Sequence, residues 1–188
     1  SRPAQAIFLE SPSNPMLELV DIAAVSEMAR AAGARVVVDN VFATPLLQRP
    51  MELGADIVVY SATKHIDGQG RALGGAILAN DQDWFETKLL PFVRNTGPAL
   101  SPFNAWLLLK GLETLELRVE RHCQSARAIA EGLESHPRVR AVYYPMLASP
   151  RQHALARRQM TAGGTSVTSD IAGERPAGAS FKENEKSH

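Results

Sequence analysis

Four short apolar runs, separated by stretches with helical periodicity, constrain the fold of this chain more than any other feature. The runs cover residues 6–9, 36–38, 57–60 and 74–79. They show little alternation of polar and apolar residues, which is typical of strands that are buried on both faces. Strands of this kind, joined by helices, form mostly parallel sheets covered by helices. The sequence therefore predicts the α/β fold class.

Helix signals lie between and after these strands. Asp21 can cap a helix that stops at Gly33, and Ser101-Pro102 is a good start for a later one. The predicted helices cover, in chain order, residues 21–32, a short segment within 44–54, residues 81–94, one long continuous helix over 101–133, and a basic helix over 150–160.

The pattern also predicts how the chain is divided. Residues 1–136 should form a large domain, and a strand over 139–144 should open a smaller α+β domain that is incomplete over residues 137–171. Residues 172–188 are rich in Gly, Pro, Ser and charge, and they should form a disordered tail.

Composition limits the class of partner. Lys plus Arg and Asp plus Glu number 20 each among 188 residues, so there is no excess of positive charge for nucleic acid or an anionic membrane. No apolar run approaches the roughly 20 residues that span a bilayer. The single Cys123 cannot form an intrachain disulfide, and the first residues do not resemble a signal peptide. These features predict a cytoplasmic protein that acts on a small molecule.

Two polar segments at strand ends carry the candidate chemistry. Asp39 follows one apolar run and Ser61-Ala62-Thr63-Lys64 follows another, so that Asp39 precedes Lys64 by 64 − 39 = 25 residues. Ligands of open α/β sheets bind at the carboxyl ends of strands, so these groups should converge. Pyridoxal phosphate needs such a lysine, an acidic partner for its ring nitrogen and donors for its phosphate. Spacing alone equally allows Asp39 to cap the next segment and Lys64 to be a surface lysine.

Five motifs in order resemble a known family, the Cys/Met-metabolism pyridoxal-phosphate enzymes. This family includes cystathionine synthases and lyases, methionine γ-lyase and the homoserine-ester sulfhydrylases. The continuation from His65 to Gly75 looks most similar to the O-succinylhomoserine sulfhydrylases. The motifs are Glu10-Ser11-Pro12-Ser13-Asn14-Pro15, Val38-Asp39-Asn40-Val41-Phe42-Ala43-Thr44-Pro45, Gln48-Arg49-Pro50, Gly54-Ala55-Asp56-Ile57-Val58 and Ser61-Ala62-Thr63-Lys64.

The resemblance implies a large domain like that of aspartate aminotransferase and a role for each matched residue. Lys64 would form the Schiff base with pyridoxal 5'-phosphate and move the substrate's α and β protons. Asp39 would pair with the pyridinium nitrogen, and Ser61 and Thr63 would bind the phosphate. Asn14 would lie near the cofactor's phenolic oxygen and the substrate carboxylate.

The activity implied is γ-replacement on an activated homoserine ester, with O-succinylhomoserine and sulfide giving homocysteine for methionine biosynthesis. The family also implies a homotetramer built as a dimer of dimers. Cystathionine γ-synthase or γ-lyase activity is an alternative. A non-catalytic fragment is another, because the family's ring-stacking tyrosine and its carboxylate-binding arginine have no counterpart in this sequence.

Other candidate sites are weaker. The glycines of residues 68–75 do not match the dinucleotide fingerprint, and Arg71 is more simply a solvated loop arginine than a substrate ligand. His122 and Cys123 are neighbours on a helix and face different ways, so no metal site is predicted. Arg118 belongs to a set of arginines that is interpreted as a solvated face.

Overall fold

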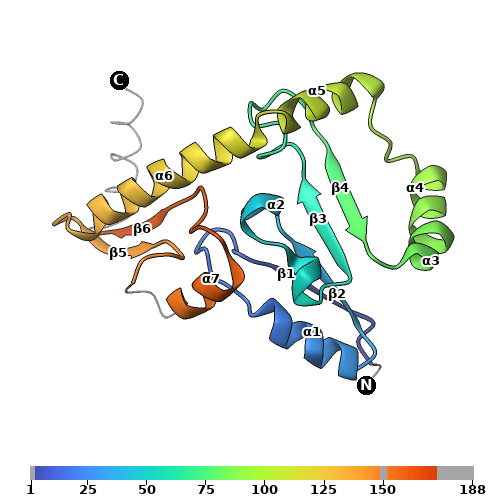
Figure 1. The fold of residues 1–188 in the computed structure, drawn as a ribbon, viewed down its shortest axis with the longest axis horizontal. Helices are drawn as coiled ribbons and strands as arrows, with labels where there is room; N and C mark the ends of the chain where they lie inside the picture. Colours follow the sequence, from blue (N-terminus) through green and yellow to red (C-terminus); the bar gives the residue numbers. More distant parts are fainter. Residues whose placement is uncertain (1–2, 149–151, 173–188) are drawn as a thin grey trace.

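A four-stranded sheet forms the centre of the structure, a computed structural model that describes residues 3–148 and 152–172. The strand order is β1-β2-β3-β4 (Figure 1). The first three strands are parallel neighbours, and β4 is antiparallel to β3. This arrangement confirms the α/β fold class with a mostly parallel sheet. The strands are β1 (Ala6–Glu10), β2 (Arg35–Asp39), β3 (Ile57–Ser61) and β4 (Gly75–Ala79).

Helix α1 (Ile22–Ala31) covers one face of the sheet. It begins where predicted, because the Asp21 side chain accepts a hydrogen bond from the Ala24 N–H at 3.1 Å and caps the helix. Ile22 and Ala29 pack against Val36 and Val38 of β2. Successive side chains of a strand point to opposite faces, so Val37 and Asp39 lie on the face away from α1.

The short helical segment after β2 is two elements rather than one. Helix α2 (Thr44–Leu47) ends at Gln48, and a 3-10 helix, η1 (Pro50–Leu53), follows. Pro50 explains the interruption, because a proline disfavours helical backbone in the residue before it, here Arg49 with φ −121° and ψ 82°. Gly54 then ends η1 with a positive φ of 97°.

The helical region after β4 is also more divided than predicted. Asp81 caps it by accepting from the Trp84 N–H at 2.9 Å. Pro91 has no N–H to donate to an earlier carbonyl, and a π-helical turn lies next to it. The three consecutive elements are α3 (Gln82–Trp84), the π-helical turn η2 (Phe85–Leu89) and α4 (Leu90–Thr96).

The prediction of one continuous helix over residues 101–133 is wrong. The chain forms α5 (Pro102–Leu112) and α6 (Leu115–Glu134), which change direction at Glu113 and Thr114 (Figure 1). The Gly111 carbonyl accepts from the Arg118 guanidinium at 2.7 Å and from the Thr114 N–H at 3.4 Å. A 3-10-type bond and a side chain therefore bind a carbonyl that a continuous α-helix would use for its own backbone.

The last described segments form a second, two-stranded sheet beside α6. Strand β5 (Val139–Tyr143) lies where the sequence predicts one, and it pairs antiparallel with β6 (Thr168–Ile171). Helix α7 (His153–Gln159) lies within the predicted basic helix. The division into domains at residue 136 stays a prediction. Residues 173–188 of the predicted disordered tail lie outside the described residues.

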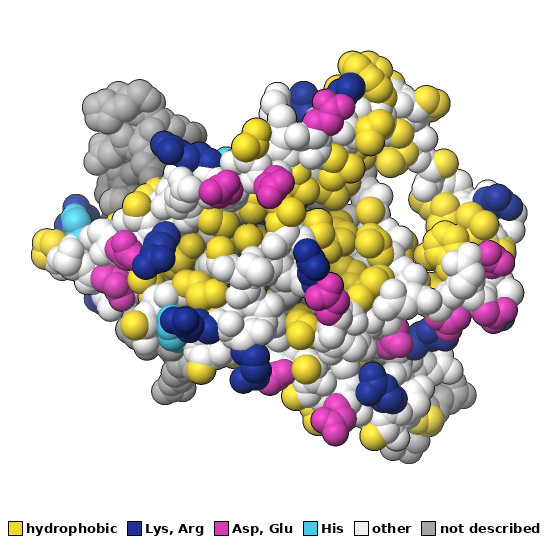
Figure 2. Space-filling model, viewed as in Figure 1, with side chains coloured by type: hydrophobic (Ala, Val, Ile, Leu, Met, Phe, Trp, Pro, Cys, Tyr) yellow, Lys and Arg dark blue, Asp and Glu magenta, His cyan; other side chains and the backbone are white. Residues whose placement is uncertain are grey.

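The outer surface of α5 is apolar. Hydrophobic side chains gather over this helix in Figure 2. They recur at helical spacing and are each about half exposed or more: Phe103, Trp106, Leu109 and Leu112. Such a stripe is typical of a surface that contacts another protein segment. No helix in the described ranges has the length and apolar character to cross a membrane.

Packing of α1 on the sheet should dominate the stability of this part of the chain. Ile22 has no exposed surface, so Ile22→Ala should lower the free energy of unfolding by about 2–5 kcal/mol because it leaves a cavity. Met28 is on the same helix and is 62% exposed, so Met28→Ala should change it by no more than about 0.5 kcal/mol. Urea denaturation of both variants measures this. Equal costs would show that α1 does not pack as described.

Candidate active site

The parallel strands bring two predicted site residues to one edge of the sheet. Asp39 is the last residue of β2 and Ser61 is the last residue of β3. Asp39 pairs with Val59, and Ser61 lies two residues beyond Val59, so Asp39 and Ser61 project from the same face. This is the face away from α1. The carboxyl ends of parallel strands are where ligands bind in open α/β sheets.

Lys64 lies in a turn that follows β3 directly. Its N–H donates to the Ser61 carbonyl at 3.1 Å, and its own carbonyl accepts from the Gly68 N–H at 2.7 Å. The Lys64 side chain is exposed, and it has no hydrogen bond or ion pair with any residue in the described ranges. The amine is therefore available to a ligand.

The other predicted residues are partly engaged. The Thr63 hydroxyl accepts from the Gly74 N–H at 3.0 Å, so it holds β4 against the turn. One Asp39 carboxylate oxygen accepts from the Val41 N–H at 3.0 Å. Asn14 is exposed in the loop after β1, and its N–H donates to the Glu10 carboxylate at 3.0 Å. Asp39, Ser61, Thr63 and Lys64 thus lie around one strand edge, with Asn14 on the adjoining loop.

A buried carboxylate holds the lysine loop, which we define as residues 62–71. Asp67 is 1% exposed and accepts from the Arg71 N–H at 2.7 Å and the Arg71 Nε at 3.0 Å. These bonds, the backbone N–H of Arg71 first among them, lower the pKa of Asp67. Arg71 therefore pairs with Asp67 within the loop.

Arg118 of α6 holds the same loop from outside, which corrects its interpretation as part of a solvated face. Its guanidinium donates to the carbonyls of His65 at 2.7 Å, Ile66 at 3.2 Å and Gly111 at 2.7 Å. Partial burial lowers the pKa of Arg118. Arg118 thus connects the lysine loop by hydrogen bonds to the segment between α5 and α6.

Two glycines permit this close approach. A Cβ added at Gly111 would overlap the Ile66 carbonyl oxygen, and one added at Gly68 would overlap the Arg118 guanidinium. The sequence analysis missed this contact. The two glycines are its sequence signal, but each faces a segment about 50 residues away, and no local pattern in the sequence identifies that segment.

His65 connects the lysine loop to the C-terminal segment. Its Nε2 lies 2.7 Å from the Thr165 hydroxyl. Burial lowers the pKa of His65, which favours the neutral ring. The residue next to Lys64 is therefore held by a segment that follows α7.

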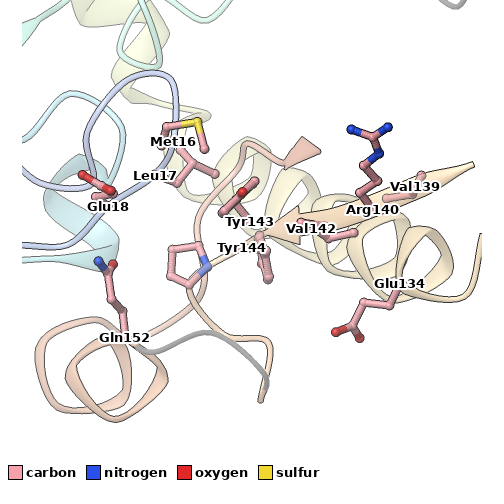
Figure 3. A pocket seen from close by; sticks show the side chains of 12 residues that line it. Met16, Leu17, Glu18, Glu134, Val139, Arg140, Val142, Tyr143, Tyr144 and Gln152 are labelled. Atoms are coloured by element: carbon pink, nitrogen blue, oxygen red, sulfur yellow. The ribbon is translucent and has the colours of Figure 1, made fainter. Parts of the chain in front are cut away.

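Several cavities of the described structure lie away from this strand edge. Three have volumes of about 530, 1030 and 410 Å³, and none is lined by a predicted site residue. The first lies between the loop after Asn14 and strand β5, where Met16, Tyr143 and Gln152 line it (Figure 3). We therefore assign the candidate site by the functional groups at the strand edge rather than by cavity size.

Comparison with known proteins decides the family. Residues 1–187 match the family described as Cys/Met metabolism PLP-dependent enzyme. The chain belongs to this family. The match confirms the family predicted from the five motifs, and it confirms pyridoxal phosphate as the family's cofactor.

Several relatives are closely similar. The O-succinylhomoserine sulfhydrylase of Mycobacterium tuberculosis is 62% identical over 89% of this chain and 41% of its own length. That of Pseudomonas aeruginosa is 54% identical over 93% of this chain and 43% of its own. A crystal structure of cystathionine gamma synthase from Xanthomonas oryzae pv. oryzae, with aminoacrylate and cysteine, is 41% identical, with a TM-score of 0.91 over 94% of this chain and 46% of that one. The chain spans less than half the length of each.

The groups at the strand edge fit the family's cofactor. Pyridoxal phosphate takes an amine at its aldehyde, an acidic group at its ring nitrogen and hydrogen-bond donors at its phosphate. Within the described residues, the Lys64 amine, the second Asp39 oxygen and the Ser61 hydroxyl have no hydrogen-bond partner. An amine, a carboxylate and a donor are thus available together at one edge.

Asp67 should stabilise the fold in a pH-dependent way. Its pKa is below the ordinary 3.8, so its contribution is complete above pH 3.8 and is lost as the pH falls through the folded-state pKa. Asp67→Asn should therefore lower the urea midpoint most at neutral pH and progressively less below pH 3.8. The exposed Asp83→Asn serves as the control, with a change of no more than about 0.5 kcal/mol at neutral pH. A cost of Asp67→Asn that grows on acidification would contradict the assignment.

Proposed function

We propose that this chain carries the lysine side of an enzyme that performs γ-replacement on O-succinylhomoserine. Sulfide would displace succinate, so that the Cγ–O bond breaks, a Cγ–S bond forms and homocysteine results. Identity of 62% to an O-succinylhomoserine sulfhydrylase is the observation that carries the choice of substrate. The strand-end group of Asp39, Ser61 and Lys64 supports the chemistry.

Lys64 would hold the cofactor and move protons. Its amine has no partner in the described ranges, so it could bond to the cofactor's aldehyde carbon. Once released by the substrate, it would remove protons from the substrate's Cα and Cβ, so that succinate can leave from Cγ, and return protons to both carbons after sulfide adds. Bound pyridoxal phosphate supplies an electron sink for the negative charge that develops at these carbons. The fixed backbone of the lysine loop would direct the amine toward the strand edge.

Asp39 would keep a proton on the cofactor's ring nitrogen. The Val41 N–H holds one carboxylate oxygen and leaves the other for that partner. An ionised carboxylate at this position favours the cationic ring, which is the stronger electron sink.

The hydroxyl of Ser61 and the segment of Thr63 would bind the phosphate. The Thr63 hydroxyl accepts from the Gly74 N–H at 3.0 Å and donates to the Gly74 carbonyl at 3.4 Å, so it would exchange this second, longer bond for one to the phosphate. Asn14, on the loop next to β2, would contact the cofactor's phenolic oxygen and the substrate carboxylate.

Two alternatives have specific support. Cystathionine γ-synthase activity is favoured by the TM-score of 0.91 to such an enzyme, and γ-lyase activity would need the same lysine. A non-catalytic piece is favoured because Lys64 does not line any of the three cavities described above. We further propose a cytoplasmic homotetramer arranged as a dimer of dimers, which the exposed apolar stripe of α5 supports.

Covalent labelling tests the role of Lys64. Borohydride reduction of the natural full-length protein with pyridoxal phosphate should fix the label on the Lys64 peptide, as mass spectrometry would show. Lys64→Ala should abolish the label and lower turnover by on the order of 10²–10⁴-fold, because the proton carrier is lost. The exposed Lys88→Ala should retain both. Label on another lysine would rule out the assignment, and no label at all would favour the non-catalytic alternative.

Choice of nucleophile tests the substrate proposal. With O-succinylhomoserine held constant, kcat/KM should be higher for sulfide than for cysteine, and homocysteine should be the product detected by chromatography. A higher kcat/KM for cysteine, with cystathionine as product, would instead identify a γ-synthase. Breakdown of cystathionine without an added nucleophile would identify a γ-lyase.

A further inference from the structure

A chain of buried amides connects the candidate site to helix α7. Asn40 and Gln48 are 0% and 1% exposed, and Gln159 of α7 is 8% exposed. Buried amides are costly unless every donor and acceptor is paired, so a group of three in the interior indicates a defined arrangement.

Gln48 is the centre of this chain. Its Nε2 donates to the Ser11 carbonyl at 2.7 Å and to the Asn40 Oδ1 at 2.8 Å. Its Oε1 accepts from the Gln159 Nε2 at 2.9 Å. Its backbone carbonyl accepts from the Asn40 Nδ2 at 2.9 Å. A side chain that gives two hydrogens and accepts one must be an amide, since a carboxylate cannot donate.

The partners of Gln48 lie directly beside the site. Ser11 follows the last residue of β1 and opens the loop that carries Asn14, and Asn40 follows Asp39 at the end of β2. The Ser11 N–H also contacts the Asp39 carbonyl at 3.4 Å. Gln48 therefore joins the two strand ends from which the candidate ligands of the cofactor ring project.

Gln159 extends the connection to the C-terminal segment. Its Oε1 accepts from the Ile22 N–H at 3.1 Å, and its Nε2 also donates to the Val20 carbonyl at 3.0 Å. These bonds fix the Gln159 side chain at the start of α1. The orientation of the Gln48 amide is thereby set from α7.

We propose that Gln48 is a positioning residue for the cofactor site, which sets the Asp39 carboxylate and the Asn14 loop relative to each other, and that Gln159 holds the Gln48 amide in the orientation this requires. The inference rests on the proposed function, because it concerns the same site. Gln48 itself contacts the two strand ends and would act on the cofactor only through Asp39 and Asn14.

The consequence is measurable without turnover. If Asp39 moves relative to the ring nitrogen, the bound cofactor is held less tightly and the pH dependence of its visible absorbance changes. Gln48→Glu keeps the shape but cannot donate to Ser11 and Asn40, and Gln48→Met removes the polar group. The exposed Gln5→Glu adds the same charge away from the site and is the matched control.

The experiment measures cofactor affinity and the pH dependence of the visible absorbance for the natural full-length protein and each variant. Thermal unfolding of the cofactor-free proteins checks that each variant folds. Both Gln48 variants should bind pyridoxal phosphate about 10- to 100-fold more weakly, the range seen for outer-shell partners of metal sites, and shift the titration. Gln5→Glu should match the unmodified protein.

Gln159→Met keeps the test decisive if a Gln48 variant does not fold. This variant removes the bond between Gln159 and Gln48 but leaves the bonds from Gln48 to Ser11 and Asn40. It should therefore shift the titration in the same direction as the Gln48 variants, but by a smaller amount. Unchanged titration and affinity in folded Gln48 variants, or in folded Gln159→Met where they do not fold, would overturn the inference. Failure of the unmodified protein to bind the cofactor would instead overturn the proposed function.

Discussion

The parallel register of β2 and β3 is the constraint on which the rest of the site depends. Backbone hydrogen bonds align Asp39 with Val59, and the alternation of a strand then directs Asp39 and Ser61 to the same side. Their common orientation follows from the sheet, and a slip of one residue would turn one of them toward α1.

Contacts of the lysine loop determine the position of Lys64. The turn after β3 places Lys64 at the edge, and Asp67 from within and Arg118 from α6 fix that turn. The change of direction between α5 and α6 belongs to the same arrangement, since Arg118 binds the Gly111 carbonyl as well as the lysine loop. The turn between α5 and α6 thus helps to position the loop that carries Lys64.

The sequence predicted the elements that depend on local signals. The strands were found because their apolar runs are bounded by turn residues, and Asp21 marked the start of α1 by a bond within one turn. The break at Glu113 was missed because it depends on the direction of the Arg118 side chain, which binds the Gly111 carbonyl as well as the carbonyls of His65 and Ile66. Gln48 and Gln159 could not be linked either, because 111 residues separate them and polar residues carry no signal of burial.

The way Arg118 holds the lysine loop has a consequence for how related enzymes can differ. Its guanidinium binds the main-chain carbonyls of His65 and Ile66 rather than their side chains. Every amino acid offers the same carbonyl, so an exchange of the side chains at these two positions would leave the bonds to Arg118 in place, even where the contact between His65 and Thr165 is lost. An anchor of this kind allows the side chains beside the lysine to change while the turn that carries the lysine keeps its place.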